Sequence, residues 1–144
     1  MMNTLKATEE EKEALEKYLL QFLNLEKHFP LLPGIENESA TAQLMGLSTE
    51  ELQKLRSMYR ENAREAALEL LKEEDVLEWV DQLPFDKSDT IVAFGDSSTD
   101  DLQSWFEIFS TVMEVAVEDA DFTFINSGLS YNTTSEALRR MDRD

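Results

Sequence analysis

Cysteine is absent from the 144-residue sequence, which excludes disulfides and thiolate metal sites. No apolar run approaches the ~20 residues that a membrane-spanning helix needs. The opening stretch, MMNTLKATEEEKEALEK, also lacks the apolar segment of a signal peptide. These absences predict a soluble, cytoplasmic protein with no membrane span.

Basic side chains are scarce, with 13 lysines and arginines against 31 acidic residues and a net charge of −18. Such a field repels nucleic acid and anionic membrane surfaces. Residues 39–62 have the outline of a helix-turn-helix, but the second helix is nearly neutral, whereas DNA readers present a basic surface there. We therefore expect no nucleic-acid partner.

Five acids in the second half could suggest a cation site, but they lack the spacing and the central glycine of a calcium loop. We expect neither a metal nor another cofactor, and we interpret the first two as acids that favour a helix N-terminus. The five are Asp100, Asp101, Glu118, Asp119 and Asp121.

Hydrophobic residues make up 42% of the chain, enough for a core, and their pattern divides it into two parts. Residues 1–84 are predicted to be an α-helical N-terminal domain. Thr8 and Glu11 have capping-box spacing and open a helix that continues to the break at FPLLPG, residues 29–34. A short helix over 39–45 should end at Gly46, and Ser48 with Glu51 should cap a longer one.

Residues 85–144 show a different pattern, strand, helix, strand and helix. Strands are predicted at 90–94 and 121–126, with a helix between them over 102–117. Thr133 and Glu136 have capping-box spacing and open the last helix. This order predicts a parallel sheet covered by helices. Two strands alone leave apolar surface uncovered, so we expect an exposed patch that the helical part or a second copy of the chain covers.

Ser97 lies just past the first predicted strand, where α/β proteins bind ligands, and just before a helix whose N–H groups could stabilise an oxyanion. The alternative is that Ser98 or Thr99 caps the helix and Ser97 merely belongs to the turn. The segment FGDSSTDDLQSW, residues 94–105, resembles the first block of the SGNH (GDSL) hydrolases. INSGLSYNTTSEALRR, residues 125–140, resembles their second block. The helical part is similar to the N-terminal extension of a bacterial subfamily.

The resemblance implies a flavodoxin-like three-layer αβα fold and a serine esterase that acts on a small acyl ester. It makes Ser97 the nucleophile and one oxyanion donor through its own N–H, while Asp96 and Thr99 shape the loop. Asn126 and Gly128 match the start of the second block. Tyr131 stands where the family has the glycine that supplies a second oxyanion donor.

The family's third block, with its asparagine, and its Asp-x-x-His do not occur in residues 1–144. The single histidine, His28, is interpreted as a surface residue at a helix end. We therefore expect a hydrolase truncated after its second block, a fragment, or a domain that a partner chain completes, with weak activity or none. The alternative is a non-catalytic helical module for interaction or dimerisation.

Overall fold

The computed structural model describes residues 8–22 and 24–141. The first part of the chain is helical, as predicted, and the expected domain boundary falls between its last helix and the first strand. Its elements are α1 (Glu9–Leu15), the π-helical turn η1 (Glu16–Leu20), α2 (Leu25–His28), α3 (Glu38–Leu44), α4 (Thr49–Leu70) and α5 (Glu74–Asp81). None of these described helices, nor those that follow, has the length and apolar character needed to cross a bilayer.

Local capping explains where the helices begin. The Ser48 hydroxyl accepts a hydrogen bond from the Glu51 N–H at 3.2 Å, and the Glu51 carboxylate accepts one from the Ser48 N–H at 2.7 Å. Together they form the predicted capping box of α4, and Thr8 with Glu11 form the same pair before α1. The single helix predicted between residue 8 and FPLLPG is wrong, because the chain passes through η1 and a turn before α2.

The second part contains β1 (Thr90–Gly95), α6 (Ser97–Asp100), α7 (Trp105–Ala116), β2 (Thr123–Gly128) and α8 (Thr134–Arg140). The two strands pair in parallel, from Thr90 opposite Thr123 to Gly95 opposite Gly128. The predicted strand–helix–strand unit is therefore confirmed, and the described fold is mixed α/β with a small two-stranded parallel sheet.

The elements of this part differ from the prediction in their bounds and in one additional helix. Asp121 has φ = 53°, which a strand does not tolerate, so β2 starts two residues late and carries Asn126 and Gly128 inside it. The extra helix α6 was not predicted. The following helix, α7, begins at Trp105 rather than at residue 102 because the Ser104 hydroxyl caps it by accepting from the Glu107 N–H.

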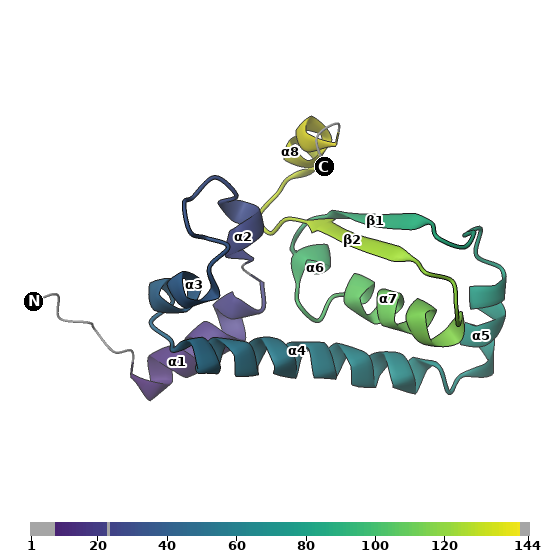
Figure 1. The fold of residues 1–144 in the computed structure, drawn as a ribbon, viewed down its shortest axis with the longest axis horizontal. Helices are drawn as coiled ribbons and strands as arrows, with labels where there is room; N and C mark the ends of the chain where they lie inside the picture. The colour runs from purple at the N-terminus through teal and green to yellow at the C-terminus, as the bar shows by residue number, and fades with distance from the viewer. Residues whose placement is uncertain (1–7, 23, 142–144) are drawn as a thin grey trace, which may run out of the picture.

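Helix α7 lies between the sheet and α4, as Figure 1 shows. Phe124 of β2 points to α7, with its ring centre 6.1 Å from that of Phe106 and 6.3 Å from that of Phe109. These edge-on ring contacts join one face of the sheet to the helix. On the far side of α7, the long helix α4 buries Leu52, Leu55, Tyr59, Ala63 and Ala67 along one stripe.

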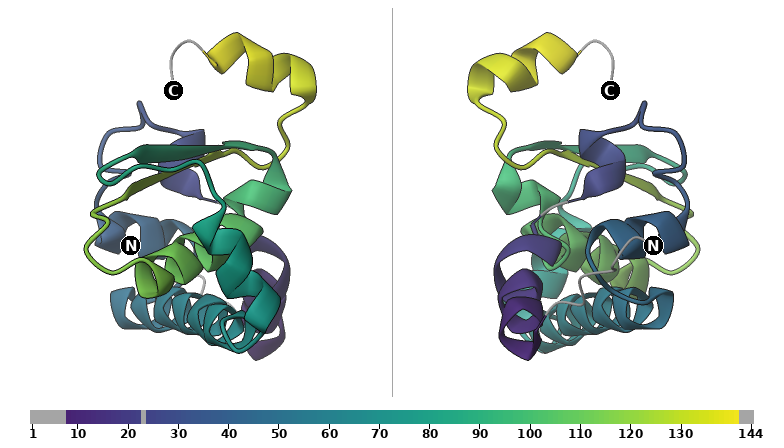
Figure 2. Two further views of the ribbon diagram at one scale, coloured as in Figure 1. Left: turned by 90° about the vertical axis from the view of Figure 1, so that its right-hand side faces the viewer. Right: turned by 90° about the vertical axis from the view of Figure 1, so that its left-hand side faces the viewer.

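The sheet's other face is open. Val92 and Ile125 are partners in the β1–β2 register and keep 47% and 41% of their surface exposed. The views in Figure 2 show α8 on this side of the sheet, beyond the ends of the strands. The predicted exposed patch is confirmed in part: Val92 is exposed on this face, whereas Phe122 and Phe124, which the prediction also included, lie on the opposite face and are partly covered. Parallel sheets are normally covered on both faces.

Candidate functional site

Ser97 is the first residue of α6 and directly follows the carboxyl end of β1 through Asp96. Its side chain is exposed, and its hydroxyl makes no hydrogen bond with any other residue that the structure describes. Asp96 caps α6, because its Oδ1 accepts from the Ser98 N–H at 3.0 Å and from the Ser98 hydroxyl at 2.9 Å. These two bonds, the main-chain one first, lower the pKa of the Asp96 carboxyl. The alternative in which Ser98 or Thr99 caps the helix is therefore wrong.

Thr99 is buried within the turn and stabilises it. Its side chain is buried, and its Oγ1 accepts from the Trp105 indole N–H at 3.2 Å. A Cβ at position 95 would lie 2.3 Å from the same oxygen. The end of β1 can therefore lie this close to Thr99 only because residue 95 is glycine. Asp96 and Thr99 thus fix the shape of the loop that presents Ser97.

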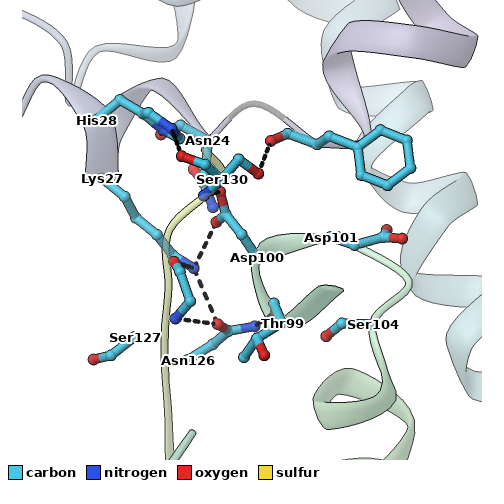
Figure 3. Close-up of polar contacts among 12 residues, drawn as sticks. Asn24, Lys27, His28, Thr99, Asp100, Asp101, Ser104, Asn126, Ser127 and Ser130 are labelled. Atoms are coloured by element: carbon cyan, nitrogen blue, oxygen red, sulfur yellow. Dashed lines mark hydrogen bonds and ion pairs between the residues drawn. The ribbon is translucent and has the colours of Figure 1, made fainter. Parts of the chain in front are cut away.

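Asn126 connects the two blocks. Its Nδ2 donates to the Thr99 carbonyl oxygen at 2.7 Å and to the Glu107 carboxylate at 2.9 Å. Its Oδ1 accepts from the Gly128 N–H at 3.0 Å and from the Lys27 ammonium at 3.2 Å. This single amide therefore bonds to α6, α7, its own strand and α2, as Figure 3 shows in part.

Gly128 lets the second block approach the turn. A Cβ at this position would lie 2.5 Å from the Asp100 nitrogen and 2.6 Å from the Thr99 carbonyl carbon. Both are main-chain atoms, which cannot rotate away. Only glycine therefore allows β2 and α6 to pack at this distance.

A buried ion pair, which the sequence did not reveal, ties the helical part to this turn. The Asp100 side chain is fully buried, and its Oδ1 lies 2.9 Å from the Lys27 Nζ. Its Oδ2 accepts from the Ser130 N–H at 2.9 Å (Figure 3). Lys27 also donates to the Gly128 carbonyl oxygen at 3.2 Å. Asp100 does lie in the first turn of the four-residue α6, as interpreted, but its carboxylate is buried and paired with Lys27.

His28 lies at the end of α2, as predicted, but it is half-buried rather than on the surface. Its Nδ1 is 2.9 Å from the Asn24 carbonyl oxygen, and its Nε2 is 3.1 Å from the Ser130 carbonyl oxygen. Both ring nitrogens thus face main-chain oxygens, and neither bonds to Ser97.

Tyr131 has a left-handed backbone, with φ = 67°, and 76% of its surface is exposed. A bulky residue pays an energetic penalty in this conformation, which glycine adopts freely. Arg140 of α8 lies close by in the fold and donates to the carbonyl oxygens of Ser127 at 2.8 Å and Gly95 at 3.2 Å. Arg140, the last residue of the second block, therefore binds main-chain oxygens near the ends of both strands.

A hollow of about 420 Å³ opens beside the Ser97 turn. Asp96 and Ser98 line it, but Ser97 itself does not. Its other walls combine apolar side chains with hydroxyls and an amide, and they include Phe94, Asn132, Thr133, Leu138 and Met141. The mixture suits a small ligand with both polar and apolar parts.

Within residues 8–22 and 24–141, no three histidine, aspartate or glutamate side chains come together in a way that could hold a metal ion. Comparisons with protein-family models, with curated proteins and with solved structures find no match to the chain.

Proposed function

We propose that the chain carries the nucleophile side of an ester-hydrolysing site of the SGNH (GDSL) type, with Ser97 as the attacking residue. The finer fold belongs to the same proposal. In it, the parallel pair β1–β2 with α7 on one face is one unit of a flavodoxin-like three-layer sandwich.

The observation that carries the proposal is the convergence of the two sequence blocks. Asn126 of the second block donates to the Thr99 carbonyl oxygen, two residues after Ser97 in the first block. Gly128 packs against the main chain of Thr99 and Asp100 so closely that no side chain fits. Tyr131 has a left-handed backbone at the position where the family has glycine. The Asn126 bond, the close packing of Gly128 and the backbone of Tyr131 thus all involve residues that carry the resemblance.

In the proposed reaction, the Ser97 oxygen bonds to the ester carbonyl carbon, and the alcohol leaves with a proton. Water then releases the acid from the acyl-serine. The Ser97 N–H, and the Tyr131 N–H as a second donor, would stabilise the tetrahedral oxyanion. The hollow beside the turn would receive the small acyl ester.

The serine proton needs a base to accept it. None of the described residues places a basic group in hydrogen-bond contact with the Ser97 hydroxyl. His28 faces two carbonyl oxygens, and the Asp96 carboxylate bonds to Ser98 instead. Loss of general-base help commonly costs a factor of about 10²–10⁴. Loss of one oxyanion donor costs roughly 10²–10³, and the two effects need not multiply. We therefore propose that residues 1–144 by themselves hydrolyse esters slowly.

Hydrolysis of p-nitrophenyl acetate by the chain and by Ser97→Ala tests the proposal. Ser57→Ala is the matched control, because this serine is exposed on α4 and takes no part in the site. We expect a protein-dependent rate well below about 1 s⁻¹, the low end of typical enzymes, that Ser97→Ala abolishes and Ser57→Ala retains. An equal rate in the Ser97→Ala protein would overturn the assignment of the nucleophile. A rate of about 1 s⁻¹ or more that only Ser97→Ala removes would overturn the absence of a base.

A further inference from the structure

An apolar groove that shares no lining residue with the hollow beside the Ser97 turn runs between α5 and α7. Its volume is about 400 Å³, and every side chain that lines it is apolar. We call it the tryptophan groove, and its walls include Trp79, Val80 and Leu83 from the α5 side and Trp105, Ile108 and Phe109 from α7. Figure 2, left, shows the two helices side by side.

The two tryptophans leave much of this apolar surface in water. Trp79 is 65% exposed and Trp105 is 54% exposed. Single exposed apolar residues are ordinary on a protein surface, but two tryptophans on one groove form a contiguous patch of the kind that marks interaction sites. Tryptophan is also the residue type most enriched among the anchors of protein interfaces.

The helix that forms one wall is strongly acidic on its solvent side. Asp75 lies one helical turn before Trp79 and therefore on the same flank of α5. Between residues 69 and 83 there are six carboxylates and a single lysine, Lys72, which is paired with Glu69. The carboxylates of the turn and of α5 are all exposed: Glu73, Glu74, Asp75, Glu78 and Asp81.

We propose that the tryptophan groove binds an amphipathic helix of a partner protein, with apolar residues on one face and lysines or arginines along its flanks. Apolar residues spaced at i, i+3, i+4 and i+7 would enter the groove. The basic flanks would meet the carboxylates of α5, and the net charge of −18 would favour the encounter. A second copy of this chain fits the charge poorly, because it would bring two acidic helices together.

The test uses the full chain and an 18-residue peptide of leucine and lysine whose order places all leucines on one helical face. Trp79 and Trp105 are the chain's two tryptophans and both line the groove, so intrinsic fluorescence reports its occupation directly. Two control peptides keep the length, one with the leucines and lysines shuffled and one with glutamate in place of lysine. We expect both controls to bind at least about 10-fold more weakly.

Variants locate the binding by calorimetry. Trp79→Ser should weaken the leucine–lysine peptide by at least about 10-fold. Leu77→Ser is the matched control, because Leu77 is 47% exposed on the same helix but does not line the groove, and it should change affinity less than about 2-fold. Asp75→Asn with Glu78→Gln leaves the apolar walls intact and should weaken binding while flattening its dependence on salt.

Four results would overturn the proposal. The first is equal binding of either control peptide. The second is equal weakening by Leu77→Ser and Trp79→Ser. The third is self-association in sedimentation that Trp79→Ser abolishes, which would assign the groove to a second copy. The fourth is that dodecanol displaces the peptide and occupies the groove at a lower concentration than the peptide needs to bind there. That result would assign the groove to an alkyl ligand.

Discussion

The Lys27 ammonium lies 2.9 Å from a carboxylate oxygen of Asp100, whose side chain is fully buried in the turn that begins with Ser97. The two residues come from the two parts of the chain, α2 and α6. The ion pair therefore fixes the helical part to the loop that presents the proposed nucleophile. Removal of one partner would leave a buried charge without compensation.

Lys27→Met should therefore lower the free energy of unfolding by about 3 kcal/mol, measured by urea denaturation. The double variant Lys27→Met, Asp100→Asn should recover part of this loss, because asparagine is neutral and still accepts from the Ser130 N–H. Lys72→Met, which breaks an exposed pair with Glu69, should cost less than about 1 kcal/mol. Equal losses for Lys27→Met and Lys72→Met would show that the buried pair does not hold the turn.

Gly128→Ala should be strongly destabilising, because the added Cβ would lie 2.5 Å from the Asp100 nitrogen. We expect a loss of about 3 kcal/mol in urea denaturation, at the upper end for overpacking. Gly34→Ala serves as a comparison, since its φ is 82° but nothing lies within 4 Å of the new Cβ. That change should cost about 1 kcal/mol from backbone strain alone. A smaller loss for Gly128→Ala than for Gly34→Ala would argue against the close approach of β2 and α6.

Tyr131 offers a test of the left-handed turn. Its side chain is largely exposed, so Tyr131→Gly removes little packing and relieves the cost of φ = 67°. We expect Tyr131→Gly to change the free energy of unfolding, measured by urea denaturation, by less than about 1 kcal/mol. Tyr131→Val should instead be destabilising by about 1–2 kcal/mol, because a branched side chain tolerates this conformation worst. Equal stabilities of the glycine and valine variants would contradict the positive φ.

The capping box of α4 predicts a pH dependence. The Ser48 main-chain N–H, followed by the Lys12 ammonium and the Ser48 hydroxyl, lowers the pKa of Glu51 from 4.5 to about 2. Because the pKa is lower in the folded protein, this stabilisation is fully present above about pH 4.5 and is lost as the pH falls toward 2. Carboxyl NMR titration should give a Glu51 midpoint near 2, and Glu51→Gln should lack this part of the acid destabilisation. A midpoint near 4.5 would contradict the cap.

The sequence predicted features that depend on neighbouring residues. The capping boxes at Ser48 and Thr133 and the parallel strand–helix–strand unit follow from spacing over a few residues, and all are present. The late start of β2 was missed because the left-handed conformations of Asp119 and Asp121 leave no distinctive pattern in an acidic stretch.

The candidate site was predictable only in part. The DSS turn after the first strand indicated where Ser97 lies, since the change from an apolar run to polar residues is a local signal. The Lys27–Asp100 pair spans 73 positions, and a lysine in a charged helical segment gives no sign of a buried partner. The tryptophan groove was missed for the same reason, because it forms only when α5 packs beside α7.

Selective covalent labelling tests the central claim most directly, which is that Ser97 is placed as a nucleophile. The chain would be treated with a fluorophosphonate, which phosphorylates a reactive serine with loss of fluoride, and then digested and analysed by mass spectrometry. We predict a slow reaction that gives one adduct, on Ser97, which Ser57→Ala retains and Ser97→Ala lacks. Adducts spread equally over exposed serines such as Ser57 and Ser98, or no adduct on Ser97, would contradict the account.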